Sequence, residues 1–190
     1  LRPLGKSAED YYIKQRDNNE KLEAKKKFYE MKAESDIIQA KEKNNPDDVS
    51  AVNNFNQTFG QYKNQQLSQV KNKRVKRKLE LLLNADQPES VYKIKAASFE
   101  ALEAQNIDMY NTEQNTLSAE YSLSKDPNLK DIAKQKRIES AKEFENMHLM
   151  GKPWLNKEIQ TINTDSAIFD ADVAIANNDY NKAKDILLKA

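Results

Sequence analysis

The chain has 190 residues, of which 38% are hydrophobic and 32% are charged, with three glycines, no cysteine and a formal net charge of +1. Ordinary globular domains contain about 7% glycine and about 45–50% apolar residues, so a chain this poor in both is neither a turn-rich β fold nor an α/β fold with glycine loops. A disulfide scaffold is excluded, and no stretch approaches the ~20 apolar residues that a membrane span requires. We therefore expect an all-α protein.

Three prolines divide the sequence into long helical segments. Pro46, Pro88 and Pro127 each stand at a break in the apolar periodicity, beside residues that cap or end helices. Proline in the first helical turn costs no backbone hydrogen bond, so each of them is predicted to start a helix. The intervals between them can hold helices of about 35 residues, or roughly 50 Å at 1.5 Å per residue. We expect long antiparallel helices that form an elongated bundle or hairpins.

The first two predicted helices differ in how their apolar residues are spaced. The first runs from a cap at Ser7 to about residue 43, and a run of lysines at 25–27 interrupts its sparse apolar residues, which are Tyr12, Leu22, Phe28, Met31, Ile37 and Ile38. The second covers about 47–84 and begins with four bulky side chains on one face at 3-4-3 spacing, which are Val52, Phe55, Phe59 and Tyr62. We treat these four as a candidate protein contact.

The second predicted helix also contains the most concentrated charge in the chain. Six cations fall within eight residues: Lys71, Lys73, Arg74, Lys76, Arg77 and Lys78. On a helix they would spread around most of the circumference, which suits a phosphate backbone or an acidic partner. A whole-chain charge of +1, in contrast, removes the global field expected of a dedicated nucleic-acid-binding protein. Contact of this segment with DNA therefore stays an alternative to a solvated helix face.

Four further elements are predicted after Pro88. They cover about 89–124, 128–149, a segment that restarts after Gly151 and Pro153, and 180–190. The segment after Gly151 has the cleanest apolar spacing and its face is expected to be buried; the residues are Leu155, Ile159, Ile162, Phe169, Val173 and Ala176, with Ser166 in the skipped position. Trp154 either staples the start of this segment onto the preceding helix or serves as an aromatic contact for a protein partner, and we favour the staple.

The end of the chain resembles part of a tetratricopeptide unit. The run DVAIANNDYNKAKDILLKA has a helix ending in small residues, a short polar turn at Asp179-Tyr180, then Ala183 and an apolar face at 186–188. A single unit of this kind buries little surface and normally stacks on another. The resemblance implies a TPR-like helical pair at the C-terminus.

The residues for catalysis or cofactor binding are scarce. His148 is the single histidine, cysteine is absent, and three glycines leave no place for a phosphate-binding loop. Carboxylate pairs such as Glu139 with Glu143 are common by chance in a chain with 30 acidic residues. We therefore expect no enzyme activity, no catalytic, cofactor or metal site, and no small-molecule substrate.

The apolar residues are also unevenly distributed, which suggests two domains. Residues 1–86 are expected to form a long helical hairpin or arms, and residues 87–190 a helical bundle with the TPR-like end. The chain begins with Leu1 and its first ten residues lack the basic and apolar regions of a secretory signal, so we expect it to be a fragment of a larger chain.

The order of these features resembles the helical segments of internal virion proteins of short-tailed bacteriophages, which are ejected with the genome. The similar stretches are KAESDIIQAKEKNNPDDVSAVNNF, FENMHLMGKPWLNKEIQTI and IANNDYNKAKDILLKA. The resemblance implies a multi-copy structural protein of the capsid interior or tail machinery that helps form a conduit for genome ejection. Outside that setting we expect a cytoplasmic protein. The predicted function is non-enzymatic assembly through helix–helix contacts, with self-association or other virion proteins as partners; the alternative is a helical nucleic-acid-binding or adaptor module that uses residues 71–78.

Overall fold

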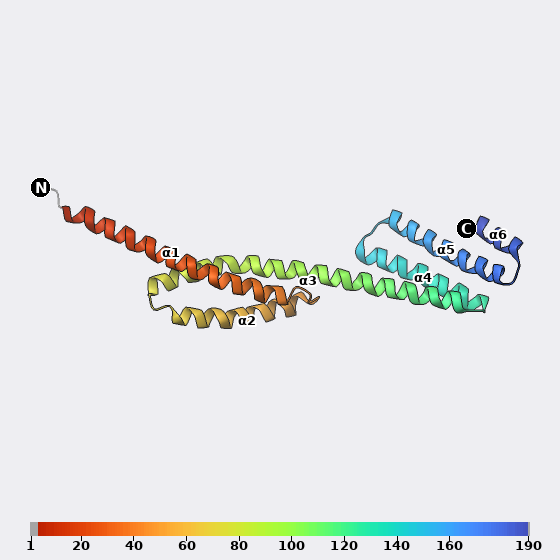
Figure 1. Ribbon diagram of the computed structural model, residues 1–190, viewed down its shortest axis with the longest axis horizontal. Helices are drawn as coiled ribbons and strands as arrows, with labels where there is room; N and C mark the ends of the chain where they lie inside the picture. The colour runs from red at the N-terminus through yellow and green to blue at the C-terminus, as the bar shows by residue number, and fades with distance from the viewer. Residues whose placement is uncertain (1–3, 190) are drawn as a thin grey trace. The chain divides into compact units, whose positions relative to one another are not determined.

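The computed structural model describes residues 4–189, and within that range the chain is entirely helical, with turns and no strand. The helices, which pack antiparallel within their units, are α1 (Leu4–Lys41), α2 (Asp48–Gln69), α3 (Lys73–Leu123), α4 (Pro127–His148), α5 (Lys152–Ala176) and α6 (Tyr180–Lys189) (Figure 1). The predicted all-α class is confirmed over these residues. None of the helices in the described range is long and apolar enough to cross a membrane.

The chain divides into two compact units, Leu1–Gln105 and Asn106–Ala190. Unit 1 contains α1, α2 and the first part of α3, and unit 2 contains the remainder of α3 with α4, α5 and α6. The sequence predicts a domain boundary after residue 86, beside Pro88, whereas in the structure the boundary between the two units follows Gln105. Helix α3 therefore contributes to the packing of both units.

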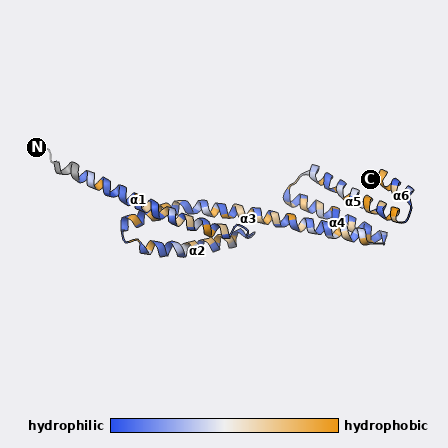
Figure 2. Ribbon diagram, in the orientation of Figure 1, coloured by the Kyte–Doolittle hydropathy of each residue, from blue (hydrophilic) through white to orange (hydrophobic). Residues whose placement is uncertain are grey.

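The core of unit 1 is a narrow seam between its three helices. On α1 the buried residues Ala24, Met31 and Ile38 recur every seven positions, and Ser35 is buried between the last two. Figure 2 shows the same pattern as scattered apolar segments in a largely hydrophilic α1. The sparse seam predicted for the first helix is confirmed at Met31 and Ile38. The prediction is wrong at Tyr12, Leu22 and Ile37, which are exposed because they fall on other faces of the helix. The small side chains of Ala24 and Ser35 lie in the seam.

The break between α2 and α3 is the main departure from the sequence-based prediction. The sequence predicts one helix over about 47–84 and the next from 89, but α2 ends at Gln69 and α3 runs from Lys73 through Pro88 to Leu123. The turn is fixed by Asn72, whose side-chain oxygen accepts hydrogen bonds from the backbone N–H groups of Arg74 (3.0 Å) and Val75 (3.4 Å). Such capping satisfies N–H groups that lack a helical acceptor. Val70 and Val75 are buried on either side of the turn and anchor it.

Among the described residues, unit 2 has two small cores. The first contains Tyr110 of α3, Ala141 and Phe144 of α4, and Ile162 of α5. The second joins α5 to α6 through three buried alanines, Ala171, Ala174 and Ala183, with Ile186 packed against them.

The alanines explain an error in the predicted stripe on α5. Ile162 is buried as expected, but Val173 is about half exposed and Ala176 is exposed, while Ser166 in the skipped position is buried. Ser166 satisfies its hydroxyl by donating to the Ile162 carbonyl at 2.7 Å. The small side chains of Ala171 and Ala174 let α6 pack closely. The face of α5 that contacts α6 is therefore the one with these alanines and not the one with Val173.

Candidate interaction surfaces

The basic segment lies at the turn between α2 and α3 and along the first two turns of α3. Lys71, Lys73, Arg74 and Arg77 are exposed, and Lys76 is half-buried; we call these five residues the basic turn. The first turn of α3 holds no acidic residue. Within the described part of the chain none of the five forms an ion pair, and the four exposed cations face solvent near the positive end of the helix dipole.

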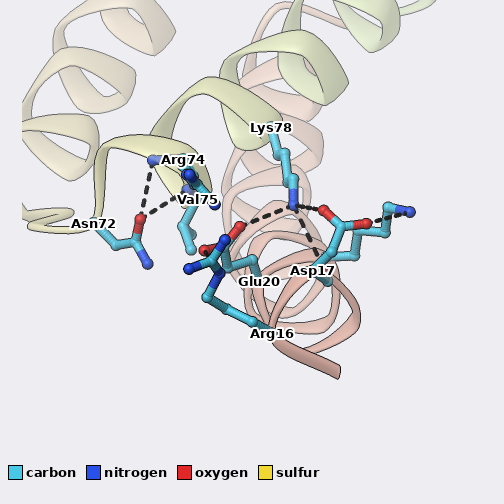
Figure 3. A network of polar contacts seen from close by, with 8 residues as sticks. Arg16, Asp17, Glu20, Asn72, Arg74, Val75 and Lys78 are labelled. Atoms are coloured by element: carbon cyan, nitrogen blue, oxygen red, sulfur yellow. Dashed lines mark hydrogen bonds and ion pairs between the residues drawn. The ribbon is translucent and has the colours of Figure 1, made fainter. Parts of the chain in front are cut away.

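The sixth cation, Lys78, is used inside the unit. Its Nζ atom donates to a carboxylate oxygen of Asp17 and, at 3.1 Å, to Oε2 of Glu20, both on α1 (Figure 3). Asp17 also pairs with Lys21 at 2.7 Å. Hydrogen bonds from Lys21 and then Lys78 lower the pKa of Asp17 to about 2, and the bond to Asp17 raises the pKa of Lys78. Lys78 therefore holds α1 on α3, in contrast to its predicted place in a polyanion-binding surface.

The four bulky residues predicted as a protein contact on α2 are taken up by the core of unit 1. Phe55 and Phe59 are buried and stacked with 5.5 Å between ring centroids, while Val52 and Tyr62 pack against the same core. These side chains hold α2 within the unit. Within this chain, Phe55 and Phe59 leave almost no surface for a partner.

Trp154 packs between helices, as expected from its place at the start of the segment after Gly151. At the start of α5 its indole lies 5.6 Å from the Phe144 ring of α4 and 6.0 Å from the Tyr110 ring of α3. Phe144 in turn lies 4.3 Å from the His148 ring. The predicted staple between α5 and α4 is confirmed.

An exposed apolar surface that the apolar spacing did not predict lies on α3 within unit 1. Leu81, Tyr92 and Phe99 are 64%, 73% and 62% exposed, and Leu102 is partly exposed. With Ala85, Pro88 and Lys95 they occupy alternating four- and three-residue steps, the spacing of a coiled-coil seam. We call positions 81, 85, 88, 92, 95, 99 and 102 the outer stripe. Its signal was present in the sequence, but the break assigned to Pro88 divided it between two predicted helices.

The outer stripe is distinct from the face of α3 that packs in unit 1. The buried α3 residues of that unit include Val75, Leu79, Leu83, Ser90 and Ile94. At 3.6 residues per turn they fall on the opposite side of the helix from Leu81, Tyr92 and Phe99. α3 is therefore apolar on two opposite faces in unit 1, and α1 and α2 cover one of them.

Polar contacts join α3, α4 and α5 in unit 2. The buried Arg137 donates from Nε to Gln114 (3.1 Å) and from a terminal nitrogen to Asp165 (3.1 Å). Asp170 accepts from Lys130 at 2.6 Å and from the Tyr121 hydroxyl at 2.7 Å. Burial, followed by this hydrogen bond, raises the pKa of Tyr121 to about 12. The functional groups of these residues are thus engaged with one another.

A hollow of about 540 Å³ lies beside the Asp170 contacts, lined by Tyr121 of α3 and by residues of α4, α5 and α6. Its lining mixes cations such as Lys130 and Lys134 with the carboxylates of Asp131 and Asp170, and Lys130 and Asp170 form an ion pair. Among the described residues no group of three or more histidine, aspartate or glutamate side chains is placed to hold a metal ion. The hollow offers no concentrated charge of one sign for a ligand.

Comparison with known proteins gives no match, whether to protein-family models, to curated proteins or to solved structures.

Proposed function

We propose that the protein is a non-enzymatic structural component that assembles in multiple copies through helix–helix contacts. The observation that carries this proposal is the outer stripe of α3, where Leu81, Tyr92 and Phe99 are each more than 60% exposed on one helix face. Contiguous apolar patches on soluble proteins mark sites of protein interaction, whereas isolated exposed apolar residues do not. A stripe at coiled-coil spacing fits a partner that is itself a helix.

The modest core of unit 1 supports the same proposal. Its seam includes small or polar buried side chains, namely Glu20, Ala24, Ser35 and Ser98. Long helices gain most of their stability from tertiary burial rather than from helix propensity, so a unit with this seam gains from covering the second apolar face of α3. Assembly would therefore add stability as well as connect copies.

The proposed setting is a bacteriophage virion, as an internal core or genome-ejection component. It is supported by the resemblance of three stretches of the chain to internal virion proteins. The proposal also includes a TPR-like role for α5 and α6, supported by their close pairing through Ala171, Ala174 and Ala183 and by the exposure of Leu187 and Leu188 on α6. A stacking helical partner would cover these two leucines.

Sedimentation velocity tests the assembly proposal. The intact chain should sediment as a monomer when dilute and as larger species at high micromolar concentration. Association should persist in high salt, because burial of apolar side chains drives it and salt does not screen that contribution. A chain that remains monomeric at every concentration and salt level would contradict the proposal.

The basic turn supports a second candidate function, the binding of nucleic acid. Four of its five cations are exposed, and no ion pair within the described residues occupies any of them. Lysine and arginine in this arrangement can neutralise phosphates and release counterions, which gives sequence-independent binding that weakens steeply with salt.

Binding to random duplex DNA at low salt tests this candidate. A variant with Lys73, Arg74, Lys76 and Arg77 changed to alanine should bind more weakly and with a shallower salt dependence. The matched control removes four exposed lysines of unit 2 and so has the same net charge; these are Lys136, Lys142, Lys152 and Lys157. Equal binding by the two variants would show that only net charge matters and would reject the basic turn as the contact.

A further inference from the structure

The outer stripe has the length and composition of a helix-pairing surface. Its seven positions extend from Leu81 to Leu102, which is about 31 Å of helix at 1.5 Å per residue. Lys95 is the charged member, and the remaining positions hold apolar side chains. Within the described part of unit 1, α1 and α2 pack on the opposite face of α3, so the stripe is open along its length.

We propose that the outer stripe binds the outer stripe of a second copy in antiparallel orientation, about a two-fold axis that passes beside Tyr92. This inference rests on the proposed assembly function and names its partner and geometry. Antiparallel pairing places Leu81 opposite Leu102 of the second copy, and Ala85 opposite Phe99 of the second copy. Tyr92 then lies beside its own counterpart, as an isologous two-fold interface requires.

The side-chain sizes favour this orientation over a parallel one. Antiparallel pairing sets the small Ala85 against the large Phe99 on both sides of the two-fold axis, and this alternation of small and large side chains fills a helix interface. Parallel pairing in register would place Phe99 against Phe99 and Ala85 against Ala85. The first pair would be crowded and the second would leave a gap.

The charges favour the same orientation. In a parallel pair, Lys95 would lie against Lys95 of the second copy inside the seam, where two like charges repel. In the antiparallel pair, Lys95 lies beside Pro88 and Glu89 of the second copy. Its carbon chain can cover the proline ring while its ammonium group reaches the Glu89 carboxylate. The Glu89 side chain is exposed and already pairs with Lys93 at 2.6 Å, so it carries a negative charge at the edge of the stripe.

The area indicates how strong the pairing is. A buried aromatic side chain covers about 150–250 Å², and Tyr92 and Phe99 are 73% and 62% exposed. With the two leucines, the proline and the alanine, each copy contributes about 500 Å², or about 1,000 Å² in total, near the lower limit for specific interfaces. The dimer should therefore form and dissociate within the accessible concentration range.

Cysteine cross-linking tests the geometry, because the chain has no cysteine of its own. Under mild oxidation of the intact chain, Tyr92→Cys should form a disulfide-linked dimer by itself. Ala85→Cys and Phe99→Cys should cross-link to each other in an equimolar mixture and not to themselves. Parallel pairing would instead cross-link each single variant to itself, which would overturn the antiparallel arrangement.

Sedimentation of surface variants separates this inference from the general proposal. Tyr92→Lys should weaken self-association roughly tenfold or more. The matched control is Tyr29→Lys, which changes a similarly exposed tyrosine of α1 (65% exposed) and should leave association unchanged. Circular dichroism should show that both variants stay helical.

The outcomes are distinct. Self-association that is insensitive to Tyr92→Lys and gives none of the expected cross-links would overturn the stripe pairing while leaving assembly through another surface. A wild-type chain that is monomeric throughout would overturn both proposals.

Discussion

Replacing Pro88 with alanine is expected to stabilise unit 1. Pro88 lies inside α3, fifteen residues after its start at Lys73, and its side chain is exposed. A proline there has no N–H to donate to the carbonyl of Asn84, four residues earlier, and its ring presses on that carbonyl. Alanine would restore the missing hydrogen bond without leaving a cavity inside unit 1, because the Pro88 side chain is exposed there.

The size of the effect follows from this position. Proline is about 3 kcal/mol less favourable than alanine in a helix interior. Some of that cost is relieved in the folded chain by local adjustment of the helix, so we expect the free energy of unfolding of unit 1 to rise by about 2–3 kcal/mol. A gain of this size from an exposed residue would be large, since surface substitutions usually change stability by less than about 0.5 kcal/mol.

Urea denaturation followed by two signals measures the effect. Far-ultraviolet circular dichroism reports all of the helices, whereas the fluorescence of Trp154, the single tryptophan, reports unit 2. Pro127→Ala is the matched control, because Pro127 occupies the first turn of α4 after the Asp126 cap, where its missing N–H has no helical acceptor. We expect Pro127→Ala to be nearly neutral.

The same experiment distinguishes the structure from the simpler interpretation of the sequence. If Pro88 began a helix, as its surroundings first suggest, alanine would be neutral or slightly destabilising, like the control. A change of less than about 0.5 kcal/mol in Pro88→Ala would therefore refute a continuous α3.

Two further predictions concern the polar contacts. The pKa of Asp17 is lowered to about 2 by Lys21 and Lys78; because the folded pKa lies below the unfolded value of about 3.9, Asp17 contributes stability above pH ~4 that is lost as the pH falls toward 2. Lys21→Gln and Lys78→Gln should each raise the Asp17 pKa in a carboxyl NMR titration, and an unchanged titration in both would contradict the assigned hydrogen bonds. Arg137→Ala should destabilise unit 2 by about 2–3 kcal/mol, since it leaves Gln114 and Asp165 without their donor. Trp154 fluorescence during denaturation measures this, with the exposed Lys142→Ala as control, and equal stability of the two variants would show that the contacts contribute nothing.

Local capping explains why much of the secondary structure could be predicted. Asp47 accepts hydrogen bonds from the N–H groups of Val49 and Ser50 at 3.1 Å, and Asp126 accepts from Asn128 at 2.9 Å. Each aspartate adjoins a proline and fixes a helix start through residues two or three positions away. The starts of α2, α4 and α6, and the Gly151-Pro153 restart of α5, lie within about one residue of the sequence-based expectation.

Tertiary packing explains what was missed. Asn72 caps α3 in the same way, but it lies among six cations and has no proline beside it. The sequence pattern therefore gave no signal for a helix start at this position. Pro88 remains inside α3 because Ser90 and Ile94, which follow it, are buried in unit 1. Burial of an adjacent turn can outweigh a local preference, and the packing partners lie on α1 and α2, far away in the sequence.

Contacts between residues far apart in the sequence also explain why the roles of the candidate surfaces could be predicted only in part. The cluster of cations could be read from the sequence, but its place at a turn between two helices could not. The contacts of Lys78 with Asp17 and Glu20 could not be read either, because the carboxylates lie 61 and 58 residues away. The stripe at Val52, Phe55, Phe59 and Tyr62 is apolar at helical spacing in either role, as core or as contact. Only the position of α1 and α3 decides that it is core.

The contacts of Lys78 with Asp17 and Glu20 lie between two parts of α1 that differ in their resistance to local unfolding. The residues from Glu9 to Arg16 are all exposed, whereas Ala24, Met31 and Ile38 are buried in the core of unit 1. Salt screens the partly exposed contacts of Lys78 with Asp17, but it does not weaken apolar packing. Rising ionic strength should therefore speed amide hydrogen exchange at the start of α1 and leave residues 24–38 protected. The concentration of ions around the protein thus sets how much of its first helix stays docked.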